Sequence, residues 1–254
     1  MATHTDNGGG AYGRKFSISR ENGQTDKNGR PYFFEWIKEI PENAGRRKFE
    51  TRPGKTGDKH YELFSALDGY VLDIRVEGKD LGSGIEDWLI VQMIDMEDEY
   101  TLEIGRLDSR YSIDLLTRLL NPHFNPVQKL RLSPYSIQDG DRYNIGVSAY
   151  SGADKLEYSR ESKFLEGRPE ATSHEWKGKK EWDFSAVAEW LFDRVRGEVV
   201  PNLIKNPISA PAPQQPPVPT TRQSNVHPTA VPDDFPTEEP AFVTEGDNGD
   251  DLPF

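Results

Sequence analysis

The chain has 254 residues, a formal net charge of −12 at pH 7 and no cysteine. The missing cysteines exclude disulfides, Cys-based zinc sites and thiol catalysis. No apolar stretch reaches the length that a membrane span needs. Residues 1–13 are polar and glycine-rich, which is typical of a mobile arm and not of a signal peptide, so we expect a cytoplasmic protein.

The body of the chain, residues 14–205, is predicted to be mainly β because apolar and polar residues alternate along it. The predicted strands are 14–20, 32–40, 61–67, 70–76, 88–94, 100–104, 127–132 and 142–150. Asn22-Gly23, Asn28-Gly29 and Asp68-Gly69 are predicted as tight turns, as is Asp139-Gly140-Asp141. Segments 46–59 and 176–182 are predicted as loops.

Two segments have helical spacing instead. In 109–120, Ile113, Leu116 and Leu120 fall on one helical face, and Ser109 or Ser112 is a candidate N-cap. In 183–195, Asp183 is a candidate N-cap and Gly197 a candidate C-cap. Strands, a helix and further strands are the order of an OB-fold, a five-stranded barrel. We therefore predict an OB-fold-like barrel with one or two helices, and an embellished or different β-barrel remains open because more than five strands are predicted.

The last part of the chain differs from the body. Residues 206–246 contain many prolines and few large apolar residues, so they are predicted to be a disordered linker with polyproline II character. Residues 206–254 hold one base and eight acids, whereas the preceding body holds 30 bases and 35 acids. The tail is therefore much more acidic than the body.

Residues 247–254 end the chain with clustered carboxylates directly before Leu-Pro-Phe. The acids attract a basic surface, proline lowers the entropy cost of binding, and the two apolar side chains and the terminal carboxylate supply anchors. These features predict a protein-interaction tip, and a solubilising acidic tail is the alternative. The residues expected to bind a partner are Asp247, Asp250, Asp251, Leu252, Pro253 and Phe254.

The ending Asp-Asp-Leu-Pro-Phe resembles the C-terminal tip of bacterial and phage single-stranded DNA-binding proteins. Those proteins join an OB-fold DNA-binding domain to a disordered linker and an acidic tip. The resemblance implies that the body binds and protects single-stranded DNA with little sequence preference. It also implies that the tip recruits replication, recombination or repair proteins. It implies no enzyme activity, cofactor or metal, and the length of the chain favours a phage or mobile-element member.

Single strands are bound by stacking bases on aromatic rings while cations contact the phosphates. The strongest candidate for such a site is 30–38, where Tyr32, Phe34 and Trp36 share one strand face between Arg30 and Lys38. That face is either a stacking platform or the barrel core. Glu35 on the opposite face mildly favours aromatics that point inward.

Two further segments are candidates for DNA contact. The basic segment 46–59 supplies Arg46, Arg47, Lys48, Arg52, Lys55 and Lys59 for phosphate contact. Its Gly54-Lys55-Thr56 imitates a P-loop, but the glycine that the motif needs five residues earlier is absent. Segment 176–182 supplies Trp176, Lys177, Lys179, Lys180 and Trp182. For each segment the alternative is an ordinary surface loop or body contact.

Two other functions remain open. The acidic body favours a replisome adaptor that binds protein and not DNA. A nuclease with a recruitment tail has little support, because the histidines are scattered and no catalytic constellation stands out. The sequence leaves the oligomeric state and the binding-site size open.

Overall fold

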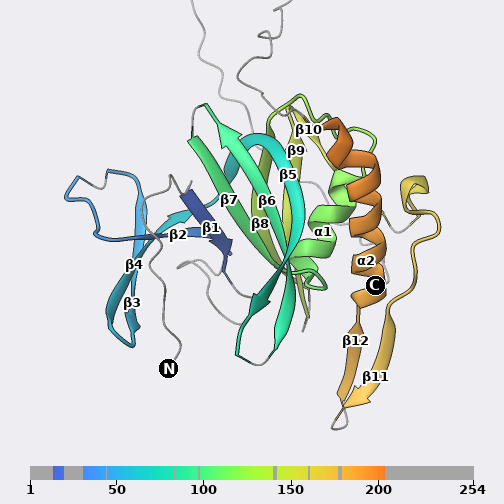
Figure 1. The fold of residues 1–254 in the computed structure, drawn as a ribbon, viewed down its shortest axis with the longest axis horizontal. Helices are drawn as coiled ribbons and strands as arrows, with labels where there is room; N and C mark the ends of the chain where they lie inside the picture. Colours follow the sequence, from blue (N-terminus) through green and yellow to red (C-terminus); the bar gives the residue numbers. More distant parts are fainter. Residues whose placement is uncertain are drawn as a thin grey trace, which may run out of the picture. The chain divides into compact units, whose positions relative to one another are not determined.

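The computed structural model describes residues 14–19, 31–43, 45–82, 84–96, 98–139, 142–159, 161–176 and 179–203 (Figure 1). These residues are mainly β, as predicted. The strands are β1 (Arg14–Ile18), β2 (Phe33–Ile37), β3 (Lys48–Gly54), β4 (Gly57–Phe64), β5 (Leu67–Asp80), β6 (Ile85–Asp95), β7 (Asp98–Arg106), β8 (Leu130–Asp139), β9 (Arg142–Ser151), β10 (Asp154–Lys155), β11 (Thr172–Trp176) and β12 (Lys179–Asp183). The helices are α1 (Arg110–Leu119) and α2 (Ser185–Arg194), with short helical turns at Lys163–Leu165, Val195–Val199 and Val200–Asn202.

Ten of these strands form one sheet in the order β10-β9-β8-β5-β6-β7-β1-β2-β4-β3. Neighbours are antiparallel except β1 and β7, which run parallel. The long strand β5 pairs with β8 over Leu67–Gly69 and with β6 over Tyr70–Asp80, with a bulge between Val71 and Asp73. Within the described chain the sheet is open, since β10 and β3 are its edges and no closed barrel forms.

One face of the sheet packs against the helices and forms the core. In β6, Leu89, Val91 and Met93 are fully buried at every second position. Leu115 and Leu116 of α1 are also fully buried, and burying each such side chain contributes about 1.5–3 kcal/mol. Leu89, Val91 and Met93 belong to one core cluster with the α1 leucines, whereas Ile90, on the other face of β6, is fully buried outside that cluster.

Helix α1 begins where the sequence predicts. The Ser109 Oγ accepts a hydrogen bond from the Ser112 N–H at 3.3 Å, so Ser109 is the N-cap. Farther along, the buried Asp114 accepts hydrogen bonds from the Val147 N–H at 2.7 Å and the Tyr158 hydroxyl at 2.7 Å. This carboxylate therefore ties α1 to β9 and to the segment after β10.

Helix α2 differs from the prediction at both ends. Its N-cap is Phe184, although the Asp183 Oδ1 still accepts a hydrogen bond from the Ser185 N–H at 2.9 Å. Gly197 does not end the helix, because the backbone continues through a π-helical turn, Val195–Val199. The buried side chains of Val195 and Val199 hold this continuation against the core.

Three predicted turns or loops are strands. Segment 46–59 is mostly the β3–β4 hairpin, closed at the Gly54–Gly57 pair. Its proline is tolerated because β3 is an edge strand. Asp68-Gly69 lies inside β5, where the Tyr100 hydroxyl and the Ile94 carbonyl lie 2.8 and 2.9 Å from where a Cβ of Gly69 would be. Segment 176–182 is part of the β11–β12 hairpin. In these segments backbone pairing and close packing override turn propensity.

Candidate nucleic-acid interface

The outward face of β2, β4 and β3 carries aromatic and cationic side chains. Trp36 pairs with Tyr61 across β2 and β4, and Tyr61 pairs with Glu50 across β4 and β3. Paired residues of antiparallel strands project from the same face. We call this set the wing face: Phe34, Trp36, Lys48, Glu50, Arg52, Lys59, Tyr61 and Leu63. Figure 1 shows β2, β3 and β4 on the side of the sheet away from α1 and α2.

Burial decides which side of β2 is core. Phe33 is fully buried, whereas Trp36 is 61% exposed. Glu35, which shares the side of Phe33, is paired with Arg14 through a hydrogen bond of 2.7 Å. The Glu35 carboxylate therefore lies on the core side but is paired with the Arg14 cation there. Phe34 and Trp36 project outward, contrary to the mild preference that Glu35 suggests from sequence.

Tyr32 is buried and joins the wing face through its hydroxyl. That hydroxyl donates to Glu50 at 2.7 Å and accepts from Arg52 at 2.6 Å. Burial, helped by the hydrogen bond to Glu50, raises the pKa of Tyr32 to about 12. The hydrogen bond from Arg52 at 2.8 Å lowers the pKa of Glu50. Tyr32 is therefore a support of the face and not one of its open rings.

Arg52 also covers two rings of the wing face. Its guanidinium lies 5.4 Å from the ring centre of Phe34 and 4.9 Å from that of Tyr61. Because the Arg52 guanidinium makes these cation–π contacts and pairs with Glu50, it faces other side chains of the protein and not solvent. Trp36 is consequently the ring of this face that is most available to another molecule.

The cations near Trp36 differ from those on the opposite side of the strands. Within the described chain, Lys38, Lys55 and Lys59 are exposed and no carboxylate lies within 4.0 Å of them. Arg46 is also exposed without such a partner, but it lies before β3 and not beside Trp36. By contrast, Arg47 forms a bidentate pair with the buried Glu62. Arg47 is therefore neutralised, whereas the exposed cations around Trp36 keep their full charge.

A hollow of about 390 Å³ lies between Trp36 and the β3–β4 hairpin. It is lined by Trp36, Tyr61, Thr56, Gly57, Asp58 and Lys59. Two aromatic residues and one lysine of the wing face thus border one space, together with Asp58 of the hairpin. Tyr61 and this hollow were not expected from sequence, because the β2–β4 register is a long-range property.

The β11–β12 hairpin carries the other aromatic candidate. Trp182 is 53% exposed, and the Lys180 Nζ lies 4.3 Å from its ring centre. Trp182 pairs with Ser173, and every described side chain of the hairpin is exposed. The hairpin leads into α2 and lies on the opposite side of the view from β2, β3 and β4 (Figure 1), so the two candidates form separate surfaces.

Several predicted site residues lie outside the described residues. These are Arg30, Lys177 and the tip residues Asp247, Asp250, Asp251, Leu252, Pro253 and Phe254. Trp176 and Lys179 are described only as paired positions of the hairpin backbone. The linker 206–246 and the arm 1–13 also lie outside the description.

The outward face continues from the wing face across the rest of the sheet. We call its part on β1, β7, β6 and β5 the central face: Lys15, Ser17, Asp73, Arg75, Glu77, Lys79, Trp88, Ile90, Gln92, Thr101 and Glu103. Ile90 pairs with Arg75 and Glu103 on this face and is fully buried there. Lys15 and Lys79 both pair with Glu103, and the Lys79 Nζ lies 4.1 Å from the ring centre of Trp88. Burial by itself would raise the pKa of Glu103, but the hydrogen bonds from the two lysines outweigh it and lower that pKa.

Sequence reasoning missed the central face. Its signal was a polar residue at every second position of 73–79, which is typical of a solvent-facing strand. That pattern does not reveal which strand pairs with 73–79; in the structure this strand is β6, which supplies Trp88.

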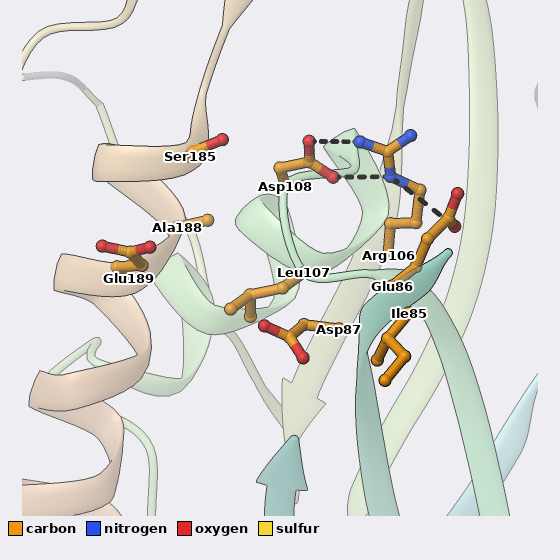
Figure 2. A pocket seen from close by; sticks show the side chains of 9 residues that line it. All are labelled: Ile85, Glu86, Asp87, Arg106, Leu107, Asp108, Ser185, Ala188 and Glu189. Carbon is orange, nitrogen blue, oxygen red and sulfur yellow. Dashed lines mark hydrogen bonds and ion pairs between the residues drawn. The ribbon is translucent and has the colours of Figure 1, made fainter. Parts of the chain in front are cut away.

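A second hollow, of about 230 Å³, lies between α2 and the ends of β6 and β7 (Figure 2). Its single base, Arg106, donates to Asp108 at 3.0 and 2.8 Å and lies 3.9 Å from Glu86. Asp87 and Glu189 add two more carboxylates to the lining. The carboxylates of this hollow would repel phosphates.

The described chain holds no cluster of three or more His, Asp or Glu residues that could bind a metal ion. None of its helices is both long enough and apolar enough to cross a membrane.

Comparison with known proteins gave no relative. No protein family matches the chain, no curated protein is similar to it, and no solved structure matches it.

Proposed function

We propose that the body binds single-stranded DNA through the wing face, with little sequence preference. One observation carries this proposal. Trp36 is largely exposed beside Tyr61, among Lys38, Lys55 and Lys59, which have no acidic partner in the described chain. A ring stacks on any base, and unpaired lysines exchange counterions for phosphates whatever the sequence.

The same geometry favours single strands over duplex. In a duplex the base faces are stacked on each other and cannot meet Trp36. In a single strand a base can stack on the rings of Trp36 and Tyr61 beside the hollow while the backbone passes the lysines of the hairpin.

We also propose that β5, β6, β7, α1, β8 and β9 form an OB-fold-like unit. Their sheet order is β9-β8-β5-β6-β7. The first strand of the unit along the chain, β5, pairs with both β6 and β8, and α1 follows the third strand, β7. An OB-fold has its helix between the third and fourth strands and binds oligonucleotides on the face of strands two and three. In this chain β1 adds to the third strand, and the wing face extends that surface.

The acidic tip completes the proposal. Residues 247–254 would recruit replication, recombination or repair proteins to coated DNA, because a tethered peptide raises the local concentration of its partner. This part rests on the resemblance of Asp-Asp-Leu-Pro-Phe to the tips of single-stranded DNA-binding proteins.

A replisome adaptor is the second candidate. The observation that favours it is the exposed apolar surface outside the wing face, with Ile85 78% exposed at the acidic hollow and Trp182 53% exposed on the hairpin. In this alternative the body binds a protein there and has no affinity for DNA.

A mobility-shift titration of the full chain with single-stranded and duplex DNA of equal length, at two salt concentrations, separates the candidates. We expect the single strand to bind far more tightly than the duplex and to bind less tightly at the higher salt. Equal affinity for both DNAs would contradict the wing-face proposal. Absence of binding to either would favour the adaptor.

A further inference from the structure

Two lysines of the central face converge on one carboxylate beside a tryptophan ring. The Lys15 Nζ lies 2.5 Å from the Glu103 Oε1, and the Lys79 Nζ pairs with the same oxygen. The Lys79 Nζ also lies 4.1 Å from the ring centre of Trp88. We call Lys15, Lys79, Trp88 and Glu103 the Glu103 cluster. Its two cations and one buried anion leave a net positive charge, whereas Arg75 of the same face pairs with two carboxylates.

The Trp88 ring is incompletely satisfied in this arrangement. Its Nε1–H is buried and has no acceptor among the described residues. Lys79 cannot serve, because an ammonium group only donates hydrogen bonds. A buried donor without an acceptor costs free energy. A ligand that brings acceptor oxygens and moves Lys79 off the ring would recover that free energy, and a phosphodiester strand is such a ligand.

We propose that the Glu103 cluster is a second nucleotide subsite, and that Glu103 keeps it closed by occupying the place of a phosphate. A strand bound at the wing face opens it. A phosphate of that strand replaces Glu103 between the two lysines, and Lys79 moves off the Trp88 ring, which then stacks on a base. This inference rests on the proposed function, since the strand reaches the cluster from the wing face.

The wing face leads directly to the Glu103 cluster. Outward-facing pairs run from Glu103 to Ser17 of β1 and from Ser17 to Phe34 of β2, and the Ser17 Oγ donates to Glu103 at 3.3 Å. Neighbouring strands are about 4.8 Å apart, so Phe34 lies about 10 Å from Glu103 across the sheet. Trp36 is about 7 Å farther along β2. A strand stacked on Trp36 therefore reaches the cluster without leaving the surface of the sheet.

Closure by Glu103 makes the subsite depend on the wing face. A free nucleotide would have to displace Glu103 from solution. A phosphate of a strand already held at Trp36 has a high effective concentration at the cluster, so it competes much better. The exchange releases few counterions, because the lysines lose one carboxylate as they gain a phosphate. We therefore expect the cluster to add less to the salt dependence than the unpaired lysines of the wing face do.

The test uses the full chain and oligo(dT). Glu103→Gln removes the competing charge and keeps the size of the side chain, so oligo(dT) should bind about three-fold or more tightly, within the range of one surface ion pair. Adding Lys15→Gln and Lys79→Gln to Glu103→Gln should remove that gain. Glu99→Gln is the matched control, because Glu99 is an exposed acid of the same strand and pairs with neither lysine. It should change the affinity by less than about two-fold.

A contact measurement shows where the strand lies. Ultraviolet crosslinking of bound oligo(dT), followed by trypsin and mass spectrometry with the modified residue located by fragmentation, reports on Trp88 through peptide 80–106, in which it is the only tryptophan. We expect Trp88 to be crosslinked in the wild type and more strongly in Glu103→Gln. The wild-type result does not depend on the folding of any variant.

Crosslinking at Trp36 without crosslinking at Trp88, in both the wild type and Glu103→Gln, would overturn this inference and leave the proposed function intact. The role of Glu103 as a substitute for phosphate would be overturned by any of three results: no gain from Glu103→Gln, an equal gain from Glu99→Gln, or a gain that persists without the two lysines. Absence of oligo(dT) binding by the wild type would overturn the proposed function and the inference with it.

Discussion

The wing face and the central face lie on the same side of the same sheet and contain the same kinds of residue. On the wing face, Trp36 is 61% exposed, and Lys59, like Lys38 and Lys55 next to this face, has no acidic partner in the described chain. On the central face, the Trp88 ring has Lys79 over it, and both Lys79 and Lys15 pair with Glu103. Arg75 likewise bonds Glu77 at 2.7 Å and Asp73 at 3.1 Å.

This difference shows that composition alone does not make a nucleic-acid surface. Binding of a polyanion gains free energy when a cation releases the counterions of a phosphate. A lysine that already has a carboxylate partner must give up that partner first. The body can therefore be acidic in total and still contain one surface that binds phosphate, because neutralisation is local.

The largest effect should come from removing the unpaired charges. Replacing Lys38, Lys55 and Lys59 together by Gln should weaken single-strand binding and reduce the slope of log K against log salt by about 2, since each phosphate contact contributes about 0.7. The slope is measured by titration at several salt concentrations. The matched control replaces Lys15, Arg75 and Lys79 by Gln. An equal reduction of the slope in the control would remove the distinction between the two faces.

The next effect should come from the aromatic rings. Trp36→Ala should cost about 1–3 kcal/mol of single-strand binding with little loss of folding stability, because its side chain is mostly exposed. Trp88→Ala should mainly reduce stability, because its ring is partly buried and packs under Lys79. Binding is followed by mobility shift and stability by urea unfolding. Unfolding of the Trp36 variant would mean that Trp36 belongs to the core.

Trp182→Ala tests the hairpin in the same assays. The cation over its ring makes it a second stacking candidate, so a loss of about 1–3 kcal/mol is expected if DNA reaches β12. Unchanged DNA binding would assign the hairpin to a protein partner instead.

A smaller effect should come from removing the acid of the central face, which would make that face more like the wing face. Glu103→Gln leaves Lys15 and Lys79 without their shared carboxylate, so single-strand affinity and the salt slope should both increase. No change in the slope would show that DNA does not reach β1 and β5.

The same residue predicts a pH dependence of stability. Because the pKa of Glu103 is lowered in the fold, its contribution is fully present above the unfolded value of 4.5 and is lost as the pH falls through the folded value. Carboxylates titrate between about pH 6 and about pH 3. Over this range the free energy of unfolding should therefore decrease more for the wild type than for Glu103→Gln. Parallel decreases in the two proteins would contradict this assignment.

The smallest effect on DNA binding should come from the tip. Deleting residues 247–254 should leave DNA affinity equal or slightly higher, because the tip's acids compete with phosphate for cations, and should abolish partner recruitment. Phe254→Ala should reproduce most of the recruitment loss and leave DNA binding unchanged, since it removes no acidic side chain. The assay is capture of host replication proteins on DNA coated with each version. Equal capture by all versions would indicate that the tip is a solubilising tail and not a recruitment peptide.

Local patterns predicted much of the secondary structure. The alternation of apolar residues located the strands around β6, β7 and β9, and helical spacing with a serine cap located α1. The predictions failed where tertiary contacts override local preference. Asp68-Gly69 has the chemistry of a turn, yet it forms part of β5 because Gly69 fits against Tyr100. The β3–β4 hairpin was predicted as a loop because its charges hide the strand pattern.

The sequence by itself determined that the protein is mainly β, that Tyr32, Phe34 and Trp36 alternate with Phe33 and Glu35, and that the chain ends in an acidic peptide. Only the tertiary structure decided that Phe33 faces the core, that Trp36 faces solvent beside Tyr61, and that Arg47 is paired while Lys59 has no acidic partner among the described residues. The physical reason is that strand alternation defines two faces without saying which is buried. Strand register and ion pairing join residues far apart in the chain, and local sequence carries no record of those partners.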